Sequence, residues 1–461
     1  MKRILIHGAT ILTLDPRIGD LRGDILVEGS RIVAVAPSIP AEHAEVVPAQ
    51  QMIALPGFVD SHRHTWQSLL RGATVDWTLA QYFAGIRGVM GRLYTPDDMY
   101  VANHLGALEA LDAGITTLYD WSHNNNTPEH ADEAVRGLKD AGLRAVFGYG
   151  NANDEWVPPS TRPTNFSDVE RVRRTHFSSD DQLVTMAFAA RGPQFTTLDI
   201  TADEFRRARD LGLRITVHVG DGLWGTTRPV VQLASRGLLG DDITYVHCNM
   251  LTDEDFREIG DSGATASISP EVELQMGHGF LATLKLIGVG VRPSISIDIV
   301  TSIAGDMFGA MRMLLAGTRA VVNDAALRQR RIVDPLPLMS RDVLEFATVQ
   351  GARACGLEAR TGSLTPGKEA DIVLIDTDSL NLIPINNPPG IVVECAHAGN
   401  VDTVIVAGRL VKRDKRLLGV DLQRMRTRVD AARDVLFRRA NVASDGSWLP
   451  RPFSKAANID C

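Results

Sequence analysis

The sequence predicts an α/β fold: a (β/α)8 barrel of the TIM type, joined to a small β-sandwich that both ends of the chain form. Between about residues 56 and 350, short β-branched runs alternate with amphipathic helical stretches, a pattern typical of parallel strands. These runs number eight, as in a closed barrel. The two flanking segments alternate apolar and polar residues instead, which indicates half-buried antiparallel strands.

Residues 1–55 form the N-terminal part of the predicted sandwich, with strands at 3–14, 23–28 and 31–35. The start, Met1-Lys2-Arg3, resembles a signal peptide, but His7 and Gly8 interrupt the apolar run and no small-residue cleavage site follows. We therefore interpret this segment as a first strand.

Residues 56–364 form the predicted barrel. Its helices include 95–114, 127–142 and 201–212, the first two opened by a Thr-Pro pair, which suits an N-cap and first helical position. The eight predicted strands are residues 52–59, 115–121, 143–149, 183–189, 214–219, 243–248, 265–269 and 293–298.

Residues 365–415 are expected to complete the sandwich, with strands at 371–375 and 402–411 around the turn-like pair Ala407-Gly408. Residues 416–461 are predicted to be a helical tail. The stretch 422–440 has a helical period and many arginines, which favours a solvated helix packed on the barrel.

Composition narrows the classes of function. The chain has 461 residues, 44% hydrophobic and 23% charged, which is enough apolar material for a sizeable core. A net charge of -8 and the even spread of Lys and Arg argue against nucleic acid and anionic membranes as partners. The four cysteines are scattered, as in reduced proteins. We therefore expect a cytoplasmic protein that acts on a small molecule and water.

Polar residues follow several predicted barrel strands at their carboxyl ends, where the working residues of such barrels lie. His62 and His64 come after the first strand and, two residues apart, point to the same side. His218 and His247 end strands five and six, and Asp298 ends the apolar strand eight, where an unpaired carboxylate is costly to bury. Imidazoles with a carboxylate suit Zn²⁺, with Fe²⁺ or Mn²⁺ as alternatives, and one position must stay open to water.

The sequence excludes three other kinds of site. No lysine occurs between Lys139 and Lys285, which rules out a metal pair bridged by a lysine on strand four and favours one ion per chain. Neither the H-x-E with P-C-x-x-C signature of other zinc deaminases nor a phosphate-binding glycine loop is present.

These motifs resemble the amidohydrolase superfamily, and most closely its branch of aminohydrolases and chlorohydrolases, which includes guanine, cytosine and thiomethyladenosine deaminases and atrazine chlorohydrolase. The resemblance covers residues 1 to about 415. It rests on residues 55–64 (LPGFVDSHRH), 114–117 (GITT) and 361–371 (TGSLTPGKEAD), together with His218, His247, Asp298 and the pairs Ala347-Thr348 and Gly351-Ala352.

The resemblance implies that His62, His64, His218 and Asp298 hold one divalent ion, and that Asp298 also moves a proton. His247 would hydrogen-bond the attacked centre, or serve as a fifth ligand. Asp221 stands where the branch usually has a Glu three residues after the strand-five histidine. It is expected either to transfer protons as that Glu does or only to bind substrate.

The implied reaction is hydrolytic deamination, or other C–N cleavage, of a small cyclic nitrogen compound. The alternatives are dechlorination, amide or lactam hydrolysis, and an inactive binding or scaffold homologue. The resemblance also makes a homodimer or higher homo-oligomer plausible.

Position alone suggests further pocket residues. Arg191, where a histidine is common in the branch, could clamp a substrate carboxylate or form a structural ion pair. His278 lies between two glycines in a loop near the same face. The complete set of expected substrate-binding residues is Trp66, Gln67, His123, Arg191, Gln194, Trp224 and Glu271.

Overall fold

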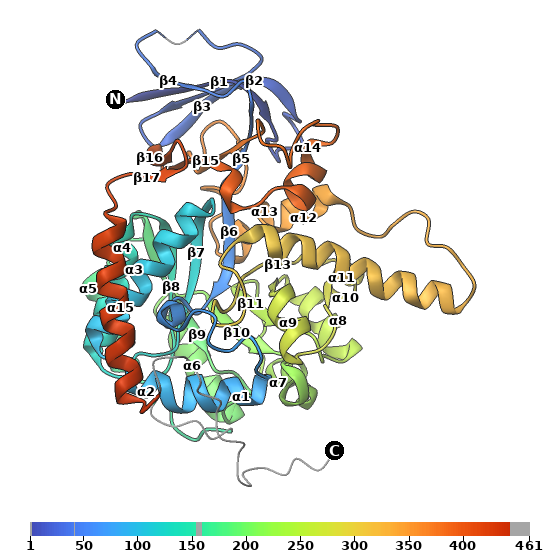
Figure 1. Ribbon diagram of the computed structural model, residues 1–461. Helices are drawn as coiled ribbons and strands as arrows, with labels where there is room; N and C mark the ends of the chain where they lie inside the picture. Colours follow the sequence, from blue (N-terminus) through green and yellow to red (C-terminus); the bar gives the residue numbers. More distant parts are fainter. Residues whose placement is uncertain (1, 41, 154–158, 443–461) are drawn as a thin grey trace.

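The computed structural model describes residues 2–40, 42–153 and 159–442, and the larger of its two domains is an eight-stranded parallel barrel (Figure 1). The sheet is closed by a parallel bridge between Arg63 and Asp298, because Asp298 N donates to His62 O (2.9 Å) and His64 N to Asp298 O (2.8 Å). The predicted barrel is confirmed. Its strands are β6 (Phe58–Arg63), β7 (Ile115–Ser122), β8 (Arg144–Tyr149), β9 (Val184–Ala190), β10 (Ile215–Val219), β11 (Ile243–His247), β12 (Thr265–Ile268) and β13 (Ser294–Ile295).

The first predicted barrel strand, 52–59, is wrong in its bounds. Its first five residues form β5 (Met52–Pro56), which belongs to the other sheet, and the barrel strand starts at Phe58. Gly57 makes the change of sheet: a Cβ there would lie 2.0 Å from Thr116 Oγ1, so only glycine lets the chain pass this close to β7. The last strand, predicted as 293–298, is only two residues long.

Local capping signals mark the ends of some helices. In α3, Thr95 and Asp98 form a reciprocal cap and Pro96 occupies the first turn, and α4 ends at Gly142 in the left-handed conformation. Around the barrel lie α3 (Pro96–Asp112), α4 (Pro128–Ala141), α5 (Phe166–His176), α6 (Leu198–Asp210), α7 (Pro229–Ser235), α8 (Asp253–Ser262), α9 (Pro270–Met276), α10 (Thr283–Gly288), α11 (Met307–Arg328), α12 (Ser340–Phe346) and α13 (Val349–Ala354). Shorter helical segments are η1 (Thr65–Leu70), α1 (Leu79–Tyr82), η2 (Phe83–Met90), α2 (Gly91–Leu93), η3 (Gly222–Thr227), α14 (Pro388–Gly390), η4 (Ile391–Cys395) and η5 (Ala398–Asn400).

Both ends of the chain meet in the second sheet, as predicted. β5 pairs antiparallel with β14 and parallel with β1, so the two halves form one continuous mixed sheet of nine strands around a separate apolar core. Its strands are β1 (Arg3–Ile11), β2 (Leu21–Glu28), β3 (Arg31–Ala36), β4 (Glu45–Pro48), β5, β14 (Ile372–Asp376), β15 (Val401–Val406), β16 (Arg409–Arg413) and β17 (Arg416–Leu417).

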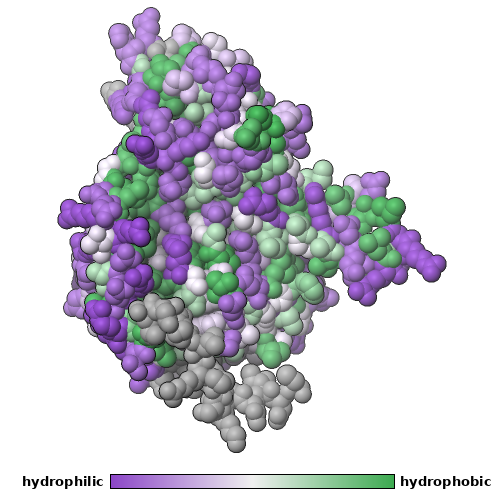
Figure 2. Space-filling model, in the orientation of Figure 1, coloured by the Kyte–Doolittle hydropathy of each residue, from purple (hydrophilic) through white to green (hydrophobic). Residues whose placement is uncertain are grey.

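The predicted tail helix is α15 (Leu422–Arg439), which lies beside α3 (Figure 1) and is joined to it by Arg428–Asp97 and Arg439–Asp98 ion pairs. The rest of the predicted tail, 443–461, lies outside the described residues. On the opposite side, the end of α11 and the segment after it project from the barrel. This arm carries apolar side chains on a mostly polar surface (Figure 2), with Ile332 88% exposed. None of the described helices has the length and apolar character of a membrane span.

Candidate active site

The polar residues that the sequence singled out meet at the carboxyl end of the barrel. His62 lies in β6 with His64 just after it, His218 lies in β10, His247 ends β11, and Asp298 follows β13. His247 and Asp298 both adopt positive φ, 76° and 66°. Because such a backbone costs of the order of 1 kcal/mol or more for a residue with a side chain, the surrounding fold must impose it.

The geometry around Asp298 suits one metal ion. Its Oδ1 lies 3.3 Å from the Nε2 of both His62 and His64. One ring nitrogen from each of His62, His64 and His218 falls within 4.8 Å of the others. Two donor atoms bound to one zinc ion at the tetrahedral angle are about 3.4 Å apart. His62 and His64 therefore lie close to both His218 and Asp298, an arrangement in which one divalent ion could be held.

Hydrogen bonding and electrostatics agree with that assignment. His64 donates from Nδ1 to the Trp121 carbonyl (3.0 Å), which leaves Nε2 facing Asp298. Burial lowers the pKa of His62 and His218, and lowers that of His64 to about 3. Burial alone would raise the pKa of Asp298, but the neighbouring histidines hold it below its usual range. These are neutral imidazoles and a carboxylate, the protonation states that bind metal.

An unsatisfied atom makes the same point. His62 Nε2 is buried, and its 3.3 Å approach to Asp298 Oδ1 does not have the geometry of a hydrogen bond. A buried polar atom left unpaired costs about 1–3 kcal/mol, and a cation at the centre of the cluster removes that cost. The donor set thus fits a divalent metal.

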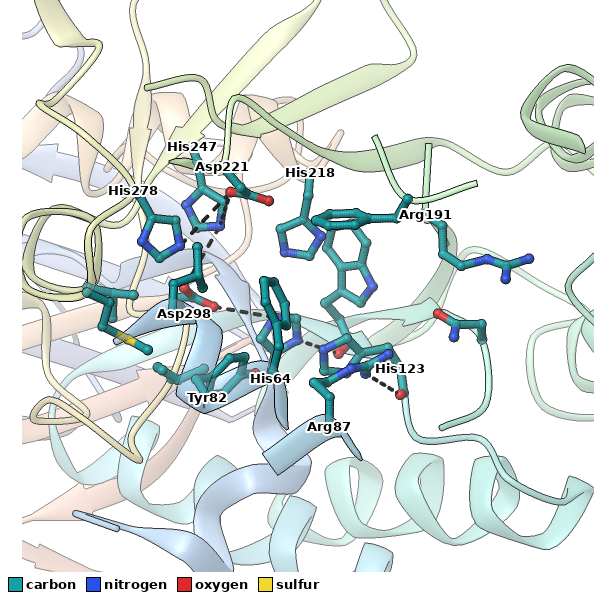
Figure 3. A pocket seen from close by; sticks show the side chains of 18 residues that line it. His64, Tyr82, Arg87, His123, Arg191, His218, Asp221, His247, His278 and Asp298 are labelled. Atoms are coloured by element: carbon teal, nitrogen blue, oxygen red, sulfur yellow. Dashed lines mark hydrogen bonds and ion pairs between the residues drawn. The ribbon is translucent and has the colours of Figure 1, made fainter. Parts of the chain in front are cut away.

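A second polar group lies next to the ligands (Figure 3). His247 Nε2 is 3.5 Å from Asp221 Oδ1 and 3.9 Å from Asp298 Oδ2, and His278 Nε2 is 4.0 Å from Asp221 Oδ1. Burial raises the pKa of Asp221 to about 6. Burial opposes the charge on His247, but Asp221, Glu273 and Asp298 raise its pKa to about 9. A carboxyl and an imidazole whose pKa values are raised therefore lie beside the candidate metal ligands.

These groups open onto a pocket at the carboxyl end of the barrel. His64, His218, His247 and Asp298 lie in its wall (Figure 3), together with further polar side chains and a set of aromatic and aliphatic ones. The aromatic and aliphatic side chains of the wall include Leu79, Tyr82, Phe83, Trp121, Phe195, Val272, Met276 and Ile299. A flat, largely apolar molecule fits such walls.

Of the seven expected substrate-binding residues, two line the pocket, His123 and Arg191. His123 stacks on the His64 ring with 3.9 Å between centroids. The Arg191 guanidinium contacts Ser160 Oγ (3.0 Å) and Glu204 Oε1 (3.2 Å), so it forms the structural ion pair that was the alternative to a substrate clamp.

Three others lie one layer behind the wall and fix residues that reach it. Trp66 donates to His123 Nδ1 (2.9 Å), and Gln67 donates to the Tyr82 hydroxyl (2.6 Å). Gln194 Nε2 donates to Asp221 Oδ2 (2.8 Å), and its Oε1 accepts from Gly220 N, so this amide sets the orientation of Asp221.

The last two, Trp224 and Glu271, lie outside the pocket wall. Trp224 packs edge-on against Phe83, with ring centroids 5.1 Å apart. Glu271 faces α11, where a Cβ on Gly309 would lie 3.0 Å from its carboxylate. The position of Glu271 after a strand could not predict where its side chain points, because on a helix such as α9 that direction changes from one residue to the next.

Sequence reasoning missed Glu273 and Arg87. Glu273, two residues after Glu271, is fully buried and accepts from His247 Nδ1 (3.1 Å). Arg87 reaches the pocket from η2, a helix with an irregular π-type turn, and donates to the His123 carbonyl (2.7 Å). The sequence could have indicated Glu273 as a site residue, because it lies on the first turn of a helix that directly follows the end of a barrel strand.

Comparisons with known proteins indicate the family to which the chain belongs. Residues 53–411 match the Amidohydrolase family. A 5-methylthioadenosine/S-adenosylhomocysteine deaminase of Pyrococcus abyssi is 28% identical over 88% of this chain and 92% of its own. A 5'-deoxyadenosine deaminase of Methanosarcina barkeri is 26% identical over 96% and 100%. The crystal structure of an adenosine deaminase from Xanthomonas campestris with bound zinc has a TM-score of 0.81 at 25% identity, over 94% of this chain and 98% of that one.

The motifs, the barrel and the family match agree with one another, and the family resemblance seen in the sequence is confirmed. The chain belongs to the amidohydrolase family and is a hydrolase.

Proposed function

We propose that this hydrolase is a zinc enzyme that removes an amino group from a carbon of a small, planar nitrogen heterocycle. The observation that carries the proposal is the cluster of His62, His64, His218 and Asp298 beside a pocket with aromatic and aliphatic walls, with His247 and Asp221 next to it. Deaminase relatives that span most of the chain support the choice of leaving group.

Zinc is proposed because three neutral imidazoles and one carboxylate form a donor set that this ion favours in catalytic sites. When bound, the ion would lower the pKa of a coordinated water toward 7 and so supply the nucleophile near neutral pH. The related adenosine deaminase structure carries zinc, which supports the same ion here.

Three side chains would move protons or stabilise charge. Asp298 Oδ2, which lies 3.9 Å from His247 Nε2, is placed to accept the proton that the attacking water loses. His247 Nε2 would hydrogen-bond the heteroatom on which negative charge develops. Asp221, held by Gln194 and with a raised pKa, would deliver a proton to the ring nitrogen or to the departing amine.

The pocket walls support a planar substrate. Phe83, Phe195 and Trp121 present ring surfaces, and Leu79 and Met276 add apolar contact. Aromatic walls bind heterocycles by stacking and exclude water from the reacting carbon, which strengthens the hydrogen bonds made there.

A substrate panel tests the proposal. Zinc-loaded protein is incubated with aminated purines and their nucleosides, pyrimidines, pterins and triazines, and ammonia release is measured. We expect ammonia from at least one compound, and loss of this activity in His64→Ala but not in His43→Ala, a change at an exposed histidine of the β3–β4 connection.

Chloride release from chlorinated triazines, or ring opening of lactams, without any ammonia would contradict the proposed leaving group and favour the other hydrolytic chemistries. A metal-loaded protein inactive on all these compounds would favour a binding role instead. The expected cytoplasmic location and homo-oligomeric state stay predictions, the second open to light scattering.

A further inference from the structure

Glu273 is a buried carboxylate that touches a reacting group without lining the pocket. It lies on the first turn of α9 and is fully buried. Its oxygens accept from Ser269 N (2.7 Å), Asn249 Nδ2 (2.9 Å) and His247 Nδ1 (3.1 Å). A carboxylate only accepts hydrogen bonds, so three donors directed at it fix both of its oxygens.

The contact with His247 has a consequence for the imidazole. Because Glu273 can only accept, the hydrogen of the contact sits on His247 Nδ1. The opposite nitrogen, Nε2, then faces Asp221 Oδ1 at 3.5 Å and the pocket that Asp221 lines. Rotation of the ring would break the contact and leave the fully buried Glu273 with one donor fewer.

We propose that Glu273 is a positioning residue, which holds the His247 ring in one orientation with Nδ1–H on Glu273 and Nε2 toward the reacting atoms. The proposal rests on the hydrolytic function given above and deepens it. Carboxylates that orient a catalytic imidazole by accepting from its other nitrogen act in this way in many enzymes, although they touch no substrate.

A purely structural role is the competing explanation, since Glu273 also accepts from Ser269 N at the start of α9. The chain offers a matched control. Glu271 lies on the same helix turn, and residues two apart on a helix point in different directions. Its carboxylate faces Gly309 of α11, outside the pocket wall.

The kinetic test compares Glu273→Gln with Glu271→Gln, each as full-length, zinc-loaded protein acting on the compound that the panel identifies. We expect Glu273→Gln to lower kcat by about 10- to 100-fold, the usual cost of losing an orienting partner, with KM and zinc content near wild type. Glu271→Gln should keep the wild-type kcat. An equal kcat in the two variants, or a loss that only follows the folded fraction, would overturn the proposal.

A second measurement needs no substrate and no variant of Glu273. Protein labelled with 15N at histidine and loaded with zinc is studied by NMR, and His247→Asn identifies the His247 signals. We expect His247 Nδ1 to carry a hydrogen. A bare Nδ1 would overturn the proposal. Absence of turnover with every compound would instead count against the proposed function, because the ring orientation is read separately.

Discussion

At the level of single residues, several features of the site lower the stability of the folded protein. His247 and Asp298 hold backbone conformations that residues with side chains avoid, and His62 Nε2 is buried without a hydrogen bond. Each feature costs about 1–3 kcal/mol in isolation. Their concentration within one cluster indicates that the fold is selected for chemistry there rather than for stability.

Asp221 gives a prediction about pH. Burial raises the pKa of its carboxyl to about 6, so the protonated form needed to deliver a proton is present below pH 6 and is lost as pH rises through that value. We expect kcat to fall on the alkaline side of about pH 6, and Asp221→Asn to lose about 10²- to 10⁴-fold in kcat, with no such limb. Initial rates from pH 5 to 9 check this. An unchanged alkaline limb in Asp221→Asn would assign it to another group.

The side chains that we propose as metal ligands could be singled out from the sequence, whereas the residues that support them could not. His62, His64, His218 and Asp298 are recognisable because strand ends and family motifs fix their place in a barrel. Gln194 was recognised as a neighbour of the pocket, but its bond to Asp221 was not. Contacts of this kind depend on side-chain directions that a linear pattern does not contain.

At the level of elements, one position with a strict requirement for a single residue type is Gly57, where the chain passes from one sheet to the other. The sequence pattern merges β5 with the start of β6 because residues 52–59 are mostly apolar, whereas in the structure the chain passes between the sheets at Gly57, close to β7.

We expect Gly57→Ala to lower the free energy of unfolding by about 1–3 kcal/mol, because its Cβ would meet Thr116 and force the strands apart. The control is Gly288→Ala at the end of α10, where a Cβ meets nothing within 4 Å. Urea denaturation of the two variants checks the difference, and equal midpoints would show that the passage is not tightly packed.

The contact between α9 and α11 predicts a pH dependence of stability. Burial raises the pKa of Glu271 to about 7, above its usual 4.5, so the stability it contributes is complete below about pH 4.5 and is lost as pH rises through 7. Glu271→Gln removes this dependence. Since the side chain is partly exposed, we expect the variant to gain no more than about 1–2 kcal/mol over wild type at pH 8 relative to pH 5.

Thermal unfolding of zinc-loaded wild type and Glu271→Gln at pH 5, 6.5 and 8 measures that difference. If Tm changed with pH in the same way in both proteins, ionisation of the Glu271 carboxyl would have no effect on stability, contrary to this prediction.

At the level of the whole molecule, the barrel and the terminal sheet were predictable because each has its own periodicity, and the resemblance implied how the two combine. The barrel strands lie within a residue or two of their expected bounds, apart from the first and the last. Both exceptions lie where the first and last barrel strands meet, next to the candidate metal ligands. There the strands are joined by an isolated bridge between Arg63 and Asp298 rather than by regular pairing.

Metal binding should also stabilise the whole fold, because the ligands come from β6, β10 and the segment after β13 and meet only in the native state. Free zinc at 100 times its dissociation constant would add about 2.7 kcal/mol to the free energy of unfolding. Removal of metal by a chelator should therefore lower Tm, and zinc should restore it. A Tm that does not respond to either would argue against a shared site.

The most direct test of the metal centre is the metal content of the purified protein by inductively coupled plasma mass spectrometry, after reconstitution with zinc and removal of loosely bound ions. We expect about one divalent ion per chain in the wild type and in His43→Ala, and much less than one in His62→Ala and Asp298→Ala. A wild-type chain without bound metal, or full retention of metal in Asp298→Ala, would contradict the assignment of these residues as ligands.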